Sequence, residues 1–172
     1  MAGAPAFTPS QTSGPYVSLV LTSVEEWAGS PTQPTVRLVG YVLDGAGRGV
    51  DDAVLEFWHV DRDGTCPAGA YRRVVTDADG RFDVDVADPR ADQDGAAGRP
   101  HVGVLIMAGG LNRHLLTRAY LPFADAGDGA DDPVLAVVAP ERRATLMARD
   151  EGDHLRFDVR LQGDDETVFL DG

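Results

Sequence analysis

The sequence has one cysteine, no lysine and no apolar run long enough to cross a membrane. A single thiol, Cys66, can form neither an intrachain disulfide nor a cysteine-only metal site. A membrane-spanning helix needs about 20 consecutive apolar residues, and no segment approaches that length. The first residues also lack the basic stretch followed by an apolar stretch that marks a signal peptide. We therefore expect a cytoplasmic protein without disulfides.

Positive charge is scarce as well. The 15 basic residues are all arginine and stand against 28 acidic residues, which gives a formal net charge of −13. Nucleic acids and anionic membrane surfaces are bound by clustered basic residues, so the long-range field of this chain has the wrong sign for either partner. The same field repels a small anionic substrate, and a site for one therefore needs a locally placed arginine.

The segments that are present predict an all-β protein. The length of 172 residues favours one domain over residues 1–172. Short β-branched or alternating segments separated by turns rich in Gly and Asp are typical of an antiparallel β-sandwich rather than an α/β fold. We expect an extended arm over residues 1–15, one short helix over Pro140–Ala148, and strands over residues 35–43, 53–60, 72–75, 81–86, 101–107, 114–121, 155–161 and 167–170.

Three of the turns begin with aspartate, at Asp44, Asp61 and Asp77. An Asp-x-Asp-Gly sequence suggests calcium, but an EF-hand loop also needs an oxygen ligand at position five and a glutamate at position twelve. Counted from Asp77, these positions hold Arg81 and Asp88. We therefore predict ordinary turns in which the aspartate side chain binds its own backbone.

The histidines offer a second metal hypothesis. His59 and Asp61 lie on one face if the strand continues through them, and a later histidine would complete an iron-binding triad. The same stretch also predicts a strand that ends in a turn, with Asp61 bonded to backbone. His101, His114 and His154 each stand at the start of an expected strand, where a lone histidine is more often structural. An independent iron enzyme of this kind would bind iron in the isolated chain.

Arg118 is unusual because of the residues around it. Strand alternation places His114, Leu116, Arg118 and Tyr120 on one face of an otherwise apolar strand. A guanidinium in such a place needs an anion, a carboxylate of another chain, or water. The sequence alone leaves open whether Arg118 forms a structural ion pair or recognises an anion.

Several segments together resemble the intradiol ring-cleavage dioxygenases, most closely the alpha chains of the two-subunit members that cleave protocatechuate. The similarity follows the same order along nearly the whole chain, and it implies a β-sandwich of the intradiol type. The segments are residues 8–16 (TPSQTSGPY), 55–61 (LEFWHVD), 111–120 (LNRHLLTRAY), 142–146 (RRATL), 156–163 (RFDVRLQG) and 166–169 (ETVF).

The resemblance also implies where the metal is held. Iron-bearing members hold a non-haem ferric ion with two tyrosines and two histidines, the histidines forming a His-x-His pair at a strand start. Here that stretch is His101-Val102-Gly103, and residues 88–100 contain no tyrosine. Glycine has no side chain with which to bind a metal. The resemblance therefore implies that Fe(III) is bound by a partner beta subunit and that this chain supplies no metal ligand and no catalytic residue.

A pocket at the interface with the beta subunit is implied in turn. By resemblance, Thr12, Gly14 and Tyr16 of the arm, together with Arg118, line the substrate site for 3,4-dihydroxybenzoate. Cleavage with O₂ to 3-carboxy-cis,cis-muconate then requires the complex of both subunits. The alternative is a noncatalytic, transthyretin-like β-sandwich that serves as a binding or scaffold module, which the generic strand pattern around residues 39–60 would also fit.

Overall fold

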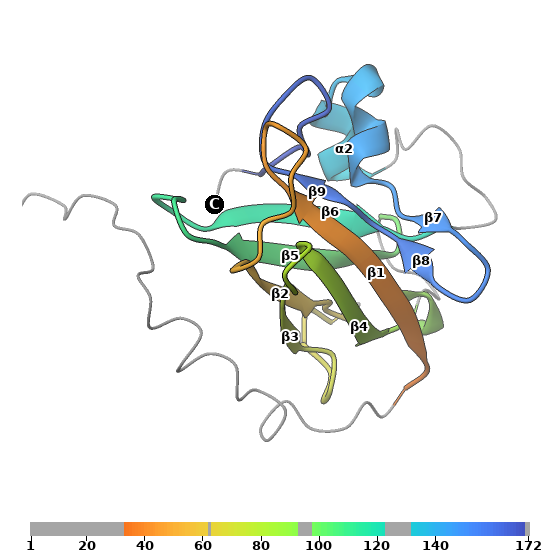
Figure 1. The fold of residues 1–172 in the computed structure, drawn as a ribbon. Helices are drawn as coiled ribbons and strands as arrows, with labels where there is room; N and C mark the ends of the chain where they lie inside the picture. The colour runs from red at the N-terminus through yellow and green to blue at the C-terminus, as the bar shows by residue number, and fades with distance from the viewer. Residues whose placement is uncertain (1–32, 62, 93–97, 123–131, 171–172) are drawn as a thin grey trace, which may run out of the picture.

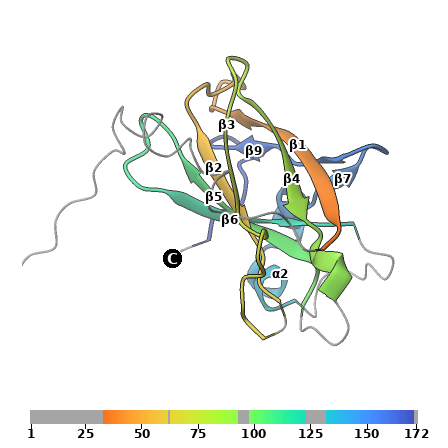
Figure 2. The same cartoon turned by 90° about the horizontal axis from the view of Figure 1, so that it is seen from below.

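Two β-sheets packed face to face form the body of the protein. The computed structural model describes residues 33–61, 63–92, 98–122 and 132–170, so the predicted arm lies outside the described residues. Figures 1 and 2 show strands β1 and β4 crossing over the strands of the other sheet. The strands are β1 (Thr35–Leu43), β2 (Val54–Trp58), β3 (Arg72–Val75), β4 (Arg81–Ala87), β5 (His101–Met107), β6 (Leu115–Tyr120), β7 (Arg149–Asp150), β8 (Leu155–Arg156) and β9 (Val159–Arg160).

One sheet has the strand order β4-β1-β8-β7, with β9 also paired to β1, and the other has the order β3-β2-β5-β6. All pairs in the second sheet are antiparallel. In the first sheet β1 is antiparallel to β4 but parallel to both β8 and β9, so this sheet is mixed. The predicted all-β sandwich is confirmed, with this departure from a purely antiparallel arrangement.

The core lies between the two sheets and is apolar. Alternate residues of the strands at the centre of the sandwich point inward, as the period-two pattern predicts. Burying these side chains is the main stabilising contribution to such a fold. The sheets meet through fully buried residues of β1 and β4 on one side and of β2 and β5 on the other: Leu38, Val42, Phe82, Val86, Leu55, Phe57, Val104 and Ile106.

The three aspartate turns have the same geometry. The Oδ1 atoms of Asp44, Asp61 and Asp77 each accept hydrogen bonds from the backbone N–H groups two and four residues later, at 2.8–3.0 Å. The glycine three residues after each aspartate has a φ of 75–77°, a conformation that other residues rarely adopt. The prediction of ordinary turns is therefore confirmed, because the carboxylates are used to close the loops.

The predicted strand over residues 155–161 is interrupted. Strand β8 pairs with β1 at Leu38 and Val39, and β9 pairs with β1 further along. Between them, the side chain of Asp158 accepts the backbone N–H of Tyr41 at 3.1 Å, in place of a ladder carbonyl. The alternating pattern was right about burial, but a side chain that binds the neighbouring backbone breaks the ladder into two short strands.

The helix prediction was also only partly right. Residues Pro140–Leu146 form a 3₁₀-helix (η2), and the one α-helix described is α2 (Pro133–Val137); a second 3₁₀-helix, η1, spans Pro89–Asp92. Asp132 caps α2 with its side chain and Pro133 occupies the first turn. The expected strand over residues 167–170 is reduced to one bridge between Leu170 and Leu116. No helix in the described ranges has the length and apolar character needed to span a membrane.

Candidate functional site

The face of sheet β3-β2-β5-β6 that is turned away from the core, here called the outer face, carries Arg118. Ala119 is fully buried in the core between the sheets, and strand alternation therefore turns Arg118 and Tyr120 to the opposite side. Figure 2 shows α2 beside β6, where Tyr120 packs against Leu135 and Leu146. The predicted shared face of Leu116, Arg118 and Tyr120 is confirmed.

Arg118 is a partly buried cation that has no carboxylate partner among the residues that the structure describes. Its Nη1 atom donates a hydrogen bond to the Tyr120 hydroxyl at 3.4 Å. Within the described ranges its guanidinium forms no ion pair. Of the two possibilities that the sequence left open, a structural ion pair is thus not found among these residues, and the group is available to an anion.

Tyr120 links Arg118 to a buried carboxylate. Its hydroxyl donates a hydrogen bond to Asp132 Oδ1 at 2.8 Å, and each residue exposes only 1% of its surface. Burial raises the pKa of Tyr120 to about 12; the adjacent Arg118 opposes this shift and Asp132 adds to it. The phenol is therefore neutral at physiological pH and keeps its proton for Asp132.

Asp132 is held by several backbone groups. Its Oδ1 accepts the N–H groups of Val134 and Leu135 at the start of α2, and its Oδ2 accepts the N–H of Arg99 at 3.1 Å. Burial, the largest single influence on the pKa of Asp132, acts to raise it. The hydrogen bonds from Leu135, Arg99, Tyr120 and Val134 together outweigh burial and keep the pKa below its ordinary value. Asp132 is thus an ionised acceptor that joins α2, β6 and the approach to β5.

Two histidines lie in the same region. The rings of His101 and Tyr120 are 5.3 Å apart, and His101 Nδ1 is 2.8 Å from the Arg99 carbonyl, which can only accept a hydrogen bond. Burial, with smaller contributions from Arg118 and His59, lowers the pKa of His101. His59 is 4% exposed, and its Nε2 lies 3.1 Å from Gln33 Nε2. The His101 imidazole is therefore predominantly neutral at pH 7.

At Gly103, where the resemblance implies the second histidine of iron-bearing members, the structure leaves no room for a side chain. Gly103 stands directly opposite Arg118 on one side and Trp58 on the other. A Cβ atom on Gly103 would lie 2.7 Å from Cε2 of the Trp58 indole, which is closer than real Cβ contacts. An imidazole cannot occupy this space unless Trp58 moves. The described part of the chain also contains no group of three or more His, Cys, Asp or Glu residues that could hold a metal. These residues therefore do not fit an iron site.

Comparison with known proteins decides the family. No family model matches the chain. The chain is 40% identical to the protocatechuate 3,4-dioxygenase alpha chain of Burkholderia cepacia, over 95% of this chain and 96% of that one. It is 35% identical to the alpha chain of Pseudomonas putida, with the same coverage. The chain belongs to the family of protocatechuate 3,4-dioxygenase alpha chains.

A solved structure agrees with the family. The dioxygenase domain of a dioxygenase carbohydrate-binding protein fusion from Streptomyces sp. SirexAA-E has a TM-score of 0.55 and 25% identity, covering 98% of this chain and 97% of that one. Intradiol dioxygenases depend on non-haem iron. The fold is therefore the intradiol dioxygenase sandwich. In this alpha chain, however, the Trp58 indole of β2 fills the space beside Gly103 of β5, so these residues do not fit a metal site.

The predicted site residues are described only in part. Arg118 lies on the outer face as stated above, whereas Thr12, Gly14 and Tyr16 lie outside the described residues. Their approach to Arg118 thus stays a prediction. Trp58 and Asp132 had no predicted role in the alpha chain. The sequence Asp132-Pro133 is a helix-start signal that would have placed Asp132 at the N-terminus of a helix.

The His59 and Asp61 hypothesis finds no geometric support. Asp61 Oδ1 accepts the N–H groups of Asp63 and Thr65, so this carboxylate closes a turn. Strand β2 ends at Trp58, before either residue, although the predicted strand ran to residue 60. His59 and Asp61 are therefore not brought together as a pair of ligands, and the alternative prediction of a strand that ends in a turn is confirmed.

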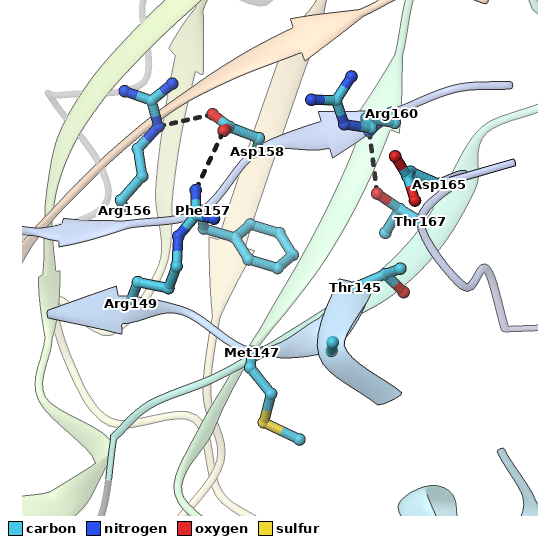
Figure 3. Close-up of a pocket in the computed structure, with 10 residues that line it drawn as sticks. Thr145, Met147, Arg149, Arg156, Phe157, Asp158, Arg160, Asp165 and Thr167 are labelled. Carbon is cyan, nitrogen blue, oxygen red and sulfur yellow. Dashed lines mark hydrogen bonds and ion pairs between the residues drawn. The ribbon is translucent and has the colours of Figure 1, made fainter. Parts of the chain in front are cut away.

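A pocket of about 270 Å³ lies elsewhere, between η2 and strands β7, β8 and β9 (Figure 3). Asp158 faces two arginines there: Arg156 Nε donates to it at 2.7 Å, and Arg149 Nη2 lies 3.6 Å away. Arg118, the one predicted site residue that the structure describes, does not line this pocket, whose described lining is Ala144, Thr145, Met147, Arg149, Arg156, Phe157, Asp158, Arg160, Asp165 and Thr167. The ion pairs of Asp158 give it a structural role in joining these strands.

Proposed function

We propose that this chain is the alpha subunit of a protocatechuate 3,4-dioxygenase that works in the cytoplasm as a hetero-oligomer with a beta subunit. The observation that carries the proposal is the similarity, over nearly the whole length, to two alpha chains of that enzyme. The reaction is the O₂-dependent intradiol cleavage of 3,4-dihydroxybenzoate to 3-carboxy-cis,cis-muconate. Residues 1–172 act as one domain, with the N-terminal arm as part of the substrate pocket.

The beta subunit holds the iron in this proposal. Non-haem Fe(III) supplies the activation of the dihydroxylated ring toward O₂, and it is bound by the partner because Gly103 and the indole of Trp58 stand where a second histidine would be needed. The alpha subunit then contributes recognition of the substrate and the walls of the pocket. This division of labour explains why an enzyme subunit can have no catalytic residue of its own.

Arg118 binds the substrate carboxylate. A formal net charge of −13 repels an anionic substrate at long range, so a local cation is required. The planar guanidinium matches a carboxylate with two parallel hydrogen bonds, and Arg118 makes no ion pair within the described ranges that would compete. Thr12, Gly14 and Tyr16 complete the pocket from the arm, with the Tyr16 ring packing on the substrate and its hydroxyl facing polar groups.

Expression of the chain alone and with its cognate beta subunit tests this proposal. Iron content and protocatechuate-dependent O₂ uptake are measured on both preparations. We expect no bound iron in the chain alone, and iron with activity in the complex. Iron and activity in the lone chain would contradict the proposal. A complex that binds the beta subunit but turns over no protocatechuate would favour the alternative of a transthyretin-like scaffold module.

A further inference from the structure

We propose that Tyr120 and Asp132 are positioning residues that hold the Arg118 guanidinium in the orientation that receives the substrate carboxylate. This inference rests on the proposed function of Arg118 and goes beyond it, because both residues are almost fully buried and are given a role through Arg118. The three groups form a chain of two hydrogen bonds: Arg118 Nη1 to the Tyr120 hydroxyl at 3.4 Å, and that hydroxyl to Asp132 Oδ1 at 2.8 Å.

The direction of both hydrogen bonds follows from the chemistry of the groups. A guanidinium only donates and an ionised carboxylate only accepts, whereas a phenol can donate one proton and accept through its oxygen. The Tyr120 proton must therefore point to Asp132, which leaves the oxygen lone pairs facing Arg118. Asp132 in this way decides which side of the Tyr120 hydroxyl is an acceptor. If a hydrogen-bond donor replaced the carboxylate, the Tyr120 hydroxyl would have to accept from it and its proton would no longer be held away from Arg118.

The anchor of this chain is rigid. Asp132 is fixed by three backbone N–H groups, two of α2 and one of Arg99. The Tyr120 ring is 1% exposed and packs against buried residues of α2 and η2. An arginine side chain loses much rotamer freedom when it binds, and a fixed acceptor at its base lowers that loss before the substrate arrives. We expect the effect in the substrate affinity rather than in the chemical step.

A purely structural role for the Tyr120 hydroxyl makes a different prediction. The buried phenol and carboxylate would satisfy each other whether or not Arg118 were present, and their loss would disturb α2 and β6 without regard to the substrate. Binding of catechol, which has the same dihydroxylated ring but no carboxylate, separates the two roles. Positioning of Arg118 matters for a ligand with a carboxylate and not for catechol.

The test uses Tyr120→Phe in the complex of both subunits. We expect the KM for protocatechuate to rise roughly fivefold to tenfold, the effect of about one hydrogen bond to a charged group, with kcat changed less than about twofold. The inhibition constant of catechol, measured as a competitor, should change less than about twofold. Tyr41→Phe is the matched control, because the Tyr41 ring packs under Arg156 on the other sheet, and it should leave both constants unchanged.

A double variant gives the decisive comparison. If Tyr120 acts through Arg118, Tyr120→Phe should add nothing to the KM of Arg118→Ala. Equal effects on protocatechuate and catechol, or additive effects in the double variant, would overturn the inference. If Arg118→Ala itself leaves the KM unchanged, the proposed function of Arg118 fails instead. Should Tyr120→Phe not assemble, Asp132→Asn keeps an oxygen for α2 and Tyr120 but removes the negative charge that orients the Tyr120 proton, and it should show the same selectivity at smaller size.

Discussion

Arg73 and Arg118 lie on the same outer face of one sheet, on its two edge strands, and differ in what their guanidinium groups contact. Arg73 on β3 stands opposite Glu56 on β2, and its Nε donates to that carboxylate at 2.9 Å. The two side chains are 10% and 17% exposed. Arg118 on β6 stands opposite Gly103 and, among the described residues, donates a hydrogen bond to the neutral hydroxyl of Tyr120 and forms no ion pair.

The difference separates a structural arginine from a binding one. At the β3 edge the charge is neutralised within the sheet, so the pair joins two strands and leaves nothing for a ligand. At the β6 edge the opposite strand presents a glycine instead of a carboxylate, and the cation keeps its capacity to bind an anion. Substitutions at the two edges should therefore affect different properties of the protein.

Arg118→Ala should have the largest effect. Loss of a charged contact to a desolvated carboxylate costs about 2–5 kcal/mol, so we expect kcat/KM for protocatechuate to fall roughly 100-fold in the assembled enzyme. The free energy of unfolding should change by less than about 0.5 kcal/mol, because no ion pair of the described residues is lost. O₂ uptake and chemical denaturation measure the two quantities. Unchanged turnover would show that Arg118 is not in the substrate site.

Arg73→Ala should show the opposite pattern. Glu56 would be left partly buried without its cation, and we expect the free energy of unfolding to fall by about 2 kcal/mol. The kcat/KM should stay within about twofold of the unmodified enzyme. Arg48→Ala is the control, since the Arg48 side chain is 80% exposed in its ion pair with Asp44 and should cost less than about 0.5 kcal/mol. A large loss of turnover in stable Arg73→Ala would refute the proposed contrast.

Gly103→Ala tests the close contact between Gly103 and Trp58, which lie on the two central strands, β5 and β2, of the same sheet. The added Cβ would meet the indole at 2.7 Å, and we expect a loss of about 1–2 kcal/mol of unfolding free energy from overpacking. Combining it with Trp58→Phe, which has a smaller ring, should recover part of that loss. Denaturation of the single and double variants measures this. Equal stability of Gly103→Ala and the unmodified chain would mean that the indole moves aside freely.

The smallest effect is a pH dependence caused by His101, the first residue of β5. Burial lowers the pKa of His101, so below about pH 6.5 the unfolded chain binds a proton that the folded chain does not. The neutral, buried His101 imidazole therefore costs no stability above that pH, and the free energy of unfolding falls as the pH drops below it. Denaturation at pH 7, 6 and 5 should show a shallower dependence for His101→Gln. An equally shallow dependence for His114→Gln, at an exposed position, would contradict this prediction, because the effect would then not depend on the burial of His101.

Local pattern was enough for much of the fold. The predicted bounds of β1, β3 and β5 agree with the structure, because alternating or continuous apolar residues there end at turns of Gly and Asp. The break between β8 and β9 could not be predicted in this way. It is caused by the Asp158 side chain binding the backbone of Tyr41, a residue 117 positions away. A contact between such distant segments leaves no trace in the period of either one.

The candidate site divides in the same manner. Arg118 and the missing second histidine at Gly103 follow from the sequence and its family resemblance. The indole that fills the place of that histidine, and the chain from Arg118 through Tyr120 to Asp132, join residues of different elements. Asp132 is a helix cap by its local sequence, yet its use as the acceptor for Tyr120 depends on how α2 docks against β6.

Residue order alone determined the class of the fold, the aspartate turns, the face on which Arg118 lies and the family. These depend on side-chain period, turn chemistry and motifs, which are local. The tertiary structure decided whether each arginine has a carboxylate partner: Glu56 meets Arg73, and Gly103 meets Arg118, only through the register of the strands. Whether a charge is neutralised depends on groups within a few ångströms, and in a β-sandwich those groups come from distant parts of the chain.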